Sequence, residues 1–551
     1  MNSSSESKVG PPAAVSTPPT RPKGRIMWAV AIVIVLLVAA VLGAWAAGLF
    51  GKKGEEKVLV VAMADNITIM DPSKANWLFG PAAVIYDTLL TRDLEGGYAD
   101  GLAQTWNYDR TNLTLTLNLK PNIKFHDGTP CDAAAIKWNI EYQANGLSGY
   151  MFAAIDTMWA QDAQTLVCNL SYADASLLFQ LSNIYSAIMS PTAIQEYGDQ
   201  YGTGTRVVGS GQFKIAEWVE NDHVTVVKNE NYSWGPSWMK NKGPAHIDKI
   251  IYRIMSDETS RMLAYEGGSV DVLMSVPPYK IQQYQQNTEM RVLTGQGQGL
   301  FYLEFNCAKD PWTNASLRRA FGFAINRTEI LDTVWHGVGT PALNYLPPIL
   351  PETNVDPSLN FSYDPAKAET LLAEAGFTDT DSNGWVENST GELTLHLWTT
   401  TRTEDISMGE ILKDQLEAIG VHVDMAHYED NALTDMCSNG DQDVALFKDS
   451  WPRADILDWL MGSGNVPYPN TAHFNDSVFD DYIAQGYAAT NDQEYTAAMT
   501  LAHEEALKNG VWAPIIYWDQ VHAVHAYVKG WVVHPLGQET VQDMVDVDIS
   551  K

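Results

Sequence analysis

The chain is poor in positive charge and in cysteine. It carries 35 Lys and Arg against 67 Asp and Glu, which gives a formal net charge of −32 over 551 residues. Nucleic-acid phosphates and anionic lipid headgroups would be repelled by such a surface, so neither is expected as a partner. The four cysteines, Cys131, Cys168, Cys307 and Cys437, form no C-x-x-C pair, which disfavours a zinc knuckle or a redox dithiol. They are either buried free thiols or members of one or two disulfides.

The sequence also lacks the short motifs of several enzyme classes. It contains no HExxH zinc helix, no G-x-S-x-G nucleophile elbow and no GxxxxGK[ST] phosphate loop. An extracellular hydrolase needs a nucleophile with a base, or a pair of carboxylates, and no motif supplies either. A binding protein is therefore favoured over an enzyme.

A long apolar run occurs only near the N-terminus. Residues 1–25 are rich in Ser, Pro and Thr, and we expect a disordered cytoplasmic tail. Residues 26–50 hold no charged side chain and would form a helix of roughly 37 Å, long enough to cross a bilayer. This length favours a transmembrane anchor over a cleaved signal peptide. A tail of 25 residues leaves no room for a signalling domain, which disfavours a sensory receptor.

The rest of the chain alternates between strand and helix patterns, which is typical of α/β lobes with mixed sheets. Strands are expected at 57–64 and, from the alternating leucines, at 113–119. Helices are expected at 81–90, in one piece at 316–331, and at 406–419 and 494–508. Asp364 and Pro365 form a helix start, with Gly376 as its stop. At 551 residues, two or more lobes are expected.

Nine Asn-x-Ser/Thr sequons follow the apolar run and indicate a glycosylated surface outside the cell. They are Asn66, Asn112, Asn169, Asn231, Asn314, Asn326, Asn360, Asn388 and Asn475.

Several short sequence motifs occur in the order that is typical of one protein family. They are YDTLL, GLAQTW with LKPNIKFHDGTP, VGSGQFKIAEW, FYLEFN with RRAFGFAINRTEI, YDPAKAETLLAEAGF, SWPRADILDWL and APIIYWDQ. Together they resemble the extracytoplasmic solute-binding proteins, family 5, of peptide ABC importers, over nearly all of the region after residue 57. The resemblance implies a two-lobed periplasmic-binding-protein-like α/β fold (class II, with an extra subdomain) after one transmembrane helix.

The resemblance also implies a domain order and a set of partners. Lobe I with its subdomain would cover 51–299, lobe II 300–518, and the return to lobe I 519–551. The chain would cross between lobes near 295–300 and 517–525, and hinge closure would enclose the ligand. We expect a monomer, displayed outside the cell on a single-pass membrane anchor. It would deliver peptides to an ABC permease whose ATPase is a separate chain. The same fold could instead carry an oligosaccharide or a nickel chelate.

The same resemblance assigns candidate ligand residues, each with a structural alternative. Asp455 would bind the ammonium of a peptide, or it is only a residue that starts a helix. Arg402 would bind the peptide carboxylate, or it is only a surface residue. The remaining candidates are aromatic or amide residues that either wall the cleft or pack in the hinge: Trp451, Trp398, Tyr302, Asn306 and Trp518.

A short acidic turn has the beginning of a calcium loop. Asp379, Asp381 and Asn383 are spaced as in D-x-D-x-N-G, and Glu387 stands at the ninth position. The twelfth position is Thr390, where a complete loop has Glu. A weak calcium site and an Asx-rich turn are the two interpretations; no other cofactor is expected.

Overall fold

The computed structural model describes residues 56–75, 78, 80–534 and 546–550. The expected tail at 1–25 and membrane segment at 26–50 lie outside these residues. Over the described ranges, no helix combines the length and the apolar character that a membrane crossing requires.

A large mixed sheet forms the centre of the part that begins at Lys57, which is one compact unit. In spatial order its strands are β17 (His422–Tyr428), β16 (Thr394–Thr400), β18 (Val444–Ser450), β12 (Met290–Phe305), β19 (Trp512–His525), β11 (Val272–Leu273), β1 (Val58–Met63), β10 (Lys249–Ile254), β9 (His223–Lys228) and β8 (Phe213–Val219), with β13 (Thr340–Pro341) paired to β19.

Smaller sheets flank this one. A four-stranded antiparallel sheet has the order β4 (Ala103–Asp109), β5 (Thr114–Leu119), β7 (Thr165–Leu170) and β6 (Ile155–Ala160). Three two-stranded ribbons are β2 (Leu90–Arg92) with β3 (Tyr98–Asp100), β14 (Glu387–Asn388) with β15 (Gly391–Glu392), and β20 (Val528–Lys529) with β21 (Asp548–Ile549).

The described α-helices are α2 (Pro81–Ile85), α3 (Ala133–Gln143), α4 (Leu177–Gln180), α5 (Pro191–Tyr197), α6 (Glu258–Glu266), α7 (Pro278–Gln285), α8 (Ala315–Ala324), α9 (Arg327–Val334), α10 (Pro365–Glu374), α11 (Thr403–Glu417), α12 (Asp430–Ser438), α13 (Ile456–Met461), α14 (Ser477–Tyr487) and α15 (Asp492–Asn509). Helix starts follow side-chain caps where the sequence offers them. Asp364 accepts from the Lys367 amide, and Asn491 accepts from the Glu494 amide.

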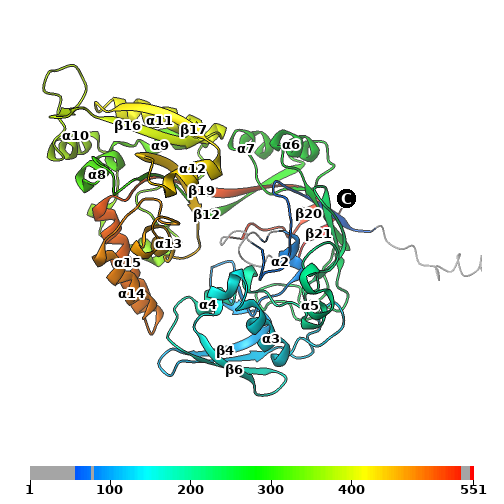
Figure 1. The fold of residues 1–551 in the computed structure, drawn as a ribbon. Helices are drawn as coiled ribbons and strands as arrows, with labels where there is room; N and C mark the ends of the chain where they lie inside the picture. The colour runs from blue at the N-terminus through cyan, green and yellow to red at the C-terminus, as the bar shows by residue number, and fades with distance from the viewer. Residues whose placement is uncertain (1–55, 76–77, 79, 535–545, 551) are drawn as a thin grey trace, which may run out of the picture. The chain divides into compact units, whose positions relative to one another are not determined.

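Strands β12 and β19 join the two halves of the sheet (Figure 1). Their antiparallel pairing runs from Met290 opposite His525 to Glu304 opposite Trp512, with an irregularity between Gly295 and Gly299. One hydrophobic core draws nearly all its side chains from residues 300–517, and another from 59–272 together with 524–549. The fold is thus two-lobed. The domain limits at 51–299, 300–518 and 519–551 stay a prediction.

Two expected helices are wrong in extent. The helix at 81–90 ends at Ile85, because the Ile85 carbonyl accepts from the Gly211 amide and the chain then turns into β2. The single helix at 316–331 is two helices, α8 and α9. Asn326 separates them. Its backbone N–H donates to the Gln415 side chain, and its own side chain caps α9 by accepting from the backbone N–H of Glu329.

Other differences are small. Leu113 has a positive φ of 53° and precedes β5, so it is not part of that strand. Helix α11 begins three residues before the expected position, and the strand at 57–64 is β1. The four cysteines are all free thiols, three of them buried, so the alternative of disulfides is wrong.

The crossing strands generate a stability prediction at Gly299. A Cβ atom on Gly299 would lie 2.0 Å from the Trp518 ring, so Gly299→Ala must displace that ring. We expect a loss of about 1–3 kcal/mol in the free energy of unfolding, the usual range for overpacking, measured by urea denaturation. Gly464→Ala is the control, because its Cβ meets nothing within 4 Å. Equal effects of the two changes would contradict this packing.

Candidate functional site

A cleft lies where the two crossing strands meet both lobes. Its volume is about 390 Å³. One wall comes from the segment around β11 and α7, including Met274 and Pro277. The other comes from lobe II, including Phe301, Lys448 and Trp518. Two lobes therefore contribute to one cavity, as a solute-binding cleft requires.

A second pocket, of about 270 Å³, adjoins the first within lobe II. The two pockets share Arg402, Asp405 and Lys448 as lining residues. Strands β16 and β18 explain this convergence: they pair in parallel, Leu397 opposite Val444, so both end at the same edge of the sheet. Polar residues that follow parallel strands commonly form ligand sites at such an edge.

Lys448 is one of the two cations, with Arg402, that line both pockets. Over residues 56–75, 78, 80–534 and 546–550, its ammonium makes no hydrogen bond or ion pair; it lies 5.7 Å from the centre of the Phe301 ring. An unpaired cation that lines two pockets is suited to bind an anionic group of a ligand. The sequence analysis missed Lys448. The signal was a charged residue directly after the apolar run VALF, within strand β18.

Arg402 lines both pockets together with Lys448, and its role toward a ligand stays a prediction. Its guanidinium pairs with Asp430 and, at 3.5 Å, with Asp405. Burial raises the pKa of the Asp405 carboxyl, and the hydrogen bond from Thr400 opposes this rise only in part. Arg402 is thus shared between two carboxylates of its own chain, whereas Lys448 is the less engaged cation.

Asp455 has an internal cationic partner. Its carboxylate accepts from Trp451 Nε1 at 3.0 Å and from Arg453 Nε at 3.2 Å. Trp451 lines a third, small pocket together with Tyr302 and Asp449. Asp455 lines none of these three pockets, and its side chain is 12% exposed. Because a carboxylate has about four lone-pair sites, these two bonds leave room for another donor.

A layer of buried polar groups supports the pocket floor. Tyr302 donates to Asp449 over 2.5 Å and stacks on Trp512 with ring centres 3.9 Å apart. Glu304 accepts from Thr471 Oγ1 at 2.6 Å and from Trp512 Nε1 at 3.1 Å. Burial raises the pKa of Asp449 to about 6 and that of Glu304 to about 8.

The remaining aromatic and amide candidates divide into two groups. Trp518 lines the first cleft and packs against Phe301 at 5.0 Å between ring centres. Trp398 packs edge-on against Tyr428, and the Asn306 amide donates to the carbonyls of Gly440 and Gln442. Neither Trp398 nor Asn306 lines any of the three pockets, and the contacts shown for both are packing contacts.

The acidic turn does bring three carboxylates together. Ligand atoms of Asp379, Asp381 and Glu387 lie within 4.8 Å of one another. The turn's own amides already bond to them: the Asn383 amide donates to Asp379 and Asp381, and the Thr380 amide donates to Glu387. The Asn383 side chain donates to Glu392 at 2.8 Å and to Asp381 at 3.4 Å. The contacts shown are those of an Asx-rich turn.

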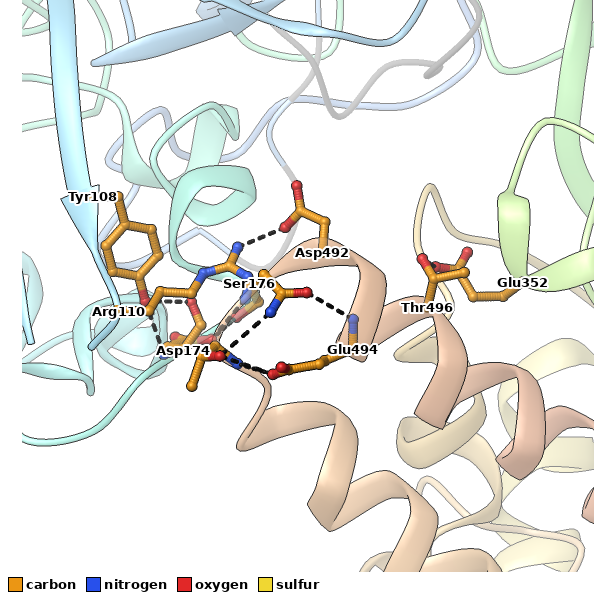
Figure 2. A network of polar contacts seen from close by, with 10 residues as sticks. Tyr108, Arg110, Asp174, Ser176, Glu352, Asp492, Glu494 and Thr496 are labelled. Carbon is orange, nitrogen blue, oxygen red and sulfur yellow. Dashed lines mark hydrogen bonds and ion pairs between the residues drawn. The ribbon is translucent and has the colours of Figure 1, made fainter.

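A polar bridge connects the four-stranded sheet to lobe II. Arg110, just after β4, forms an ion pair of 2.7 Å with Asp492 at the start of α15 (Figure 2). Nearby, the Arg453 guanidinium lies 5.3 Å from the ring centre of Phe179 in α4 and 4.9 Å from that of Tyr495 in α15. Because Asp492 is 88% exposed, the ion pair stabilises this contact only slightly.

Comparison with known proteins identifies the class. Residues 97–467 match the bacterial extracellular solute-binding proteins, family 5 (middle region). The chain therefore belongs to that family, and the prediction of a solute-binding protein rather than an enzyme is confirmed.

Named relatives and solved structures agree with this assignment. The glutathione-binding protein GsiB of Escherichia coli K12 is 26% identical over 495 residues, covering 87% of this chain and 92% of GsiB. Among structures, NikA of Brucella suis, bound to Fe(III)-EDTA, gives a TM-score of 0.77 at 19% identity and covers 90% of this chain and all of NikA. AppA of Bacillus subtilis, bound to a nonapeptide, gives 0.71 at 17% identity, with coverages of 90% and 100%. At these identities the structures show the fold.

The buried Glu304 predicts a pH dependence of stability. Its folded pKa of about 8 exceeds the ordinary value of 4.5, so the folded state retains a proton that the unfolded chain has lost. The contribution of Glu304 to the free energy of unfolding is therefore fully present below about pH 4.5 and is lost as pH rises to about 8. Glu304→Gln should flatten this slope in urea denaturation between pH 5 and 9. Glu196→Gln, on the surface, is the control; an unchanged slope in Glu304→Gln would contradict the assignment.

Proposed function

We propose that this protein captures short peptides between its two lobes and delivers them to a membrane permease. The observation that carries the proposal is Lys448, whose ammonium has no hydrogen-bond or ion-pair partner in the described part of the chain. It lies where two pockets meet, in a chain of net charge −32. A cation without a hydrogen-bonded carboxylate partner, in an acidic protein, favours a ligand carboxylate at that point. The glutathione-binding relative and the peptide-bound structural neighbours point to the same ligand class.

In this proposal the constant ends of a peptide are recognised by charge. Its carboxylate binds Lys448, with Arg402 as the second cation, and its ammonium binds Asp455. Trp451, Tyr302 and Trp518 provide apolar walls. Charge-assisted hydrogen bonds of this kind contribute roughly 1.5–3 kcal/mol each. Recognition of the ends leaves the side chains of the peptide free to vary.

A second candidate is a metal chelate, since the NikA neighbour is bound to Fe(III)-EDTA. A polycarboxylate chelate also carries the negative charge that Lys448 would bind. A neutral oligosaccharide does not, and the unpaired cation disfavours it. Calorimetric titration with peptides and with nickel–histidine separates these candidates.

The cellular setting rests on the sequence. We propose that residues 26–50 anchor the protein, that 1–25 lie in the cytoplasm, and that the binding unit acts outside the cell as a monomer. A separate permease and ATPase would receive the ligand. Glycosylation fits the six sequon residues that are exposed in the structure: Asn66, Asn112, Asn169, Asn231, Asn314 and Asn475.

The carboxylate assignment predicts a specific loss in Lys448→Met. Peptides with a free C-terminus should bind about 10- to 100-fold more weakly, the equivalent of roughly 1.5–3 kcal/mol. Their C-terminal amides should change by less than about threefold, since they carry no charge for Lys448 to bind. Isothermal titration calorimetry measures both. Lys240→Met removes an equal charge elsewhere and is the control; equal weakening of acids and amides would refute the assignment.

The ammonium assignment predicts the complementary result in Asp455→Asn, which preserves side-chain size. Peptides with a free amine should lose affinity by about tenfold or more, while N-acetylated peptides should be little affected. A melting curve of the variant checks that Arg453 and Trp451, which also bond to Asp455, still hold the fold. Identical losses for the free and acetylated forms would show that Asp455 is only a structural partner of these residues.

A further inference from the structure

Two large aromatic side chains stand open to solvent at the wall of the second pocket. Trp459 is 50% exposed and Tyr468 is 62% exposed, and both line the cavity of about 270 Å³. Leu433, Phe447 and Pro469 add apolar surface to the same wall. Exposed aromatic surface that lines a cavity is typical of a ligand-contacting site, because solvent-facing aromatics otherwise carry an energetic cost.

The residues that carry these aromatics are held in place. Trp459 lies on α13, whose Asp458 side chain accepts from Tyr487 at 2.8 Å and whose Asp458 carbonyl accepts from Asn465 at 2.7 Å. Beside Tyr468, the Asn470 amide donates to the carbonyls of Gly462 and Phe474. The wall is therefore formed before any ligand arrives, which reduces the entropy lost on binding.

The size of the pocket fits part of a ligand. Cavities that enclose a whole small ligand measure roughly 300–1,000 Å³, so about 270 Å³ suits a side chain better than an entire peptide. Lys448 lies at the passage from this pocket to the interlobe cleft. A group bound in the pocket is therefore close to whatever anion Lys448 binds.

We infer that the second pocket receives the side chain of the peptide's C-terminal residue, whose own carboxylate binds Lys448. The substrate class is then peptides that end in a large apolar or aromatic residue. Carboxylate and side chain leave the same Cα atom, so they can occupy adjoining subsites, one at Lys448 and one beside the aromatic rings of Trp459 and Tyr468. This inference rests on the proposed function. It adds a preference for the last residue of the peptide, which the charges that bind the peptide ends do not provide.

The test compares tripeptides that differ only in their last residue, Ala-Ala-Phe and Ala-Ala-Gly, by calorimetry on the purified protein. The wild-type protein should bind Ala-Ala-Phe at least about tenfold more tightly. Trp459→Ala should remove most of that preference by weakening Ala-Ala-Phe alone, and Trp459→Phe should retain part of it. Tyr468→Ala, which removes the other exposed ring that lines this pocket, should have a smaller effect in the same direction.

The controls separate the inference from the function on which it rests. Tyr363→Ala removes an aromatic ring that is 53% exposed and lines none of the three pockets, and it should leave the preference intact. If wild-type protein binds both tripeptides equally, or if Trp459→Ala weakens both equally, the inference is wrong and peptide capture stands. If neither tripeptide binds, the proposed function fails and the inference fails with it.

Discussion

The pairing of β12 with β19 is the constraint on which the rest of the structure depends. These strands, of 16 and 14 residues, belong to both halves of the large sheet. Between Gly295 and Gly299 their register shifts, and the Gly297 amide donates to the Asp519 side chain over 3.2 Å. The absence of a side chain at Gly299 makes room for the Trp518 ring. A cleft wall and the connection between lobes are thus produced by the same few residues.

The chemistry of the site follows from where the strands of lobe II end. Parallel pairing brings the ends of β16 and β18 to one edge, and therefore places Arg402 beside Lys448. Arg402 is already paired with carboxylates, while Lys448 is not. The buried Tyr302 donates to the partly buried Asp449, and both residues line the second pocket. The site is equipped to hold a charged group in a defined position, and binding requires no bond to be made or broken.

Much of the fold could be predicted from local signals. Asp364 and Asn491 act as helix caps, and Gly376 has a φ of 92°, as a helix stop requires. The signals failed where a distant segment intervened. The Ile85 carbonyl accepts a hydrogen bond from the Gly211 backbone N–H, and the helix ends there. At the break between α8 and α9, the Asn326 backbone N–H donates to the Gln415 side chain. No local pattern reveals partners that lie 89 or more residues away.

The candidate site was predicted less completely, for a related reason. Family resemblance located Arg402, Trp451 and Asp455, but residue type does not reveal which charges are already paired. Arg453, two residues from Asp455, occupies one of its oxygens, and Lys448 is conspicuous only once its surroundings are known. Trp459 is similar: in the sequence it is one residue of the motif SWPRADILDWL, and only the structure shows it half-exposed at a cavity wall.

Native mass spectrometry of the protein after incubation with a mixture of free-carboxylate and C-amidated peptides tests the central claim most directly. The account predicts complexes with the free-carboxylate peptides, and recovery of every peptide intact when the protein is denatured. Cleaved peptides would contradict a role in binding alone. Equal retention of acids and amides would contradict recognition through the ammonium at the junction of the two pockets.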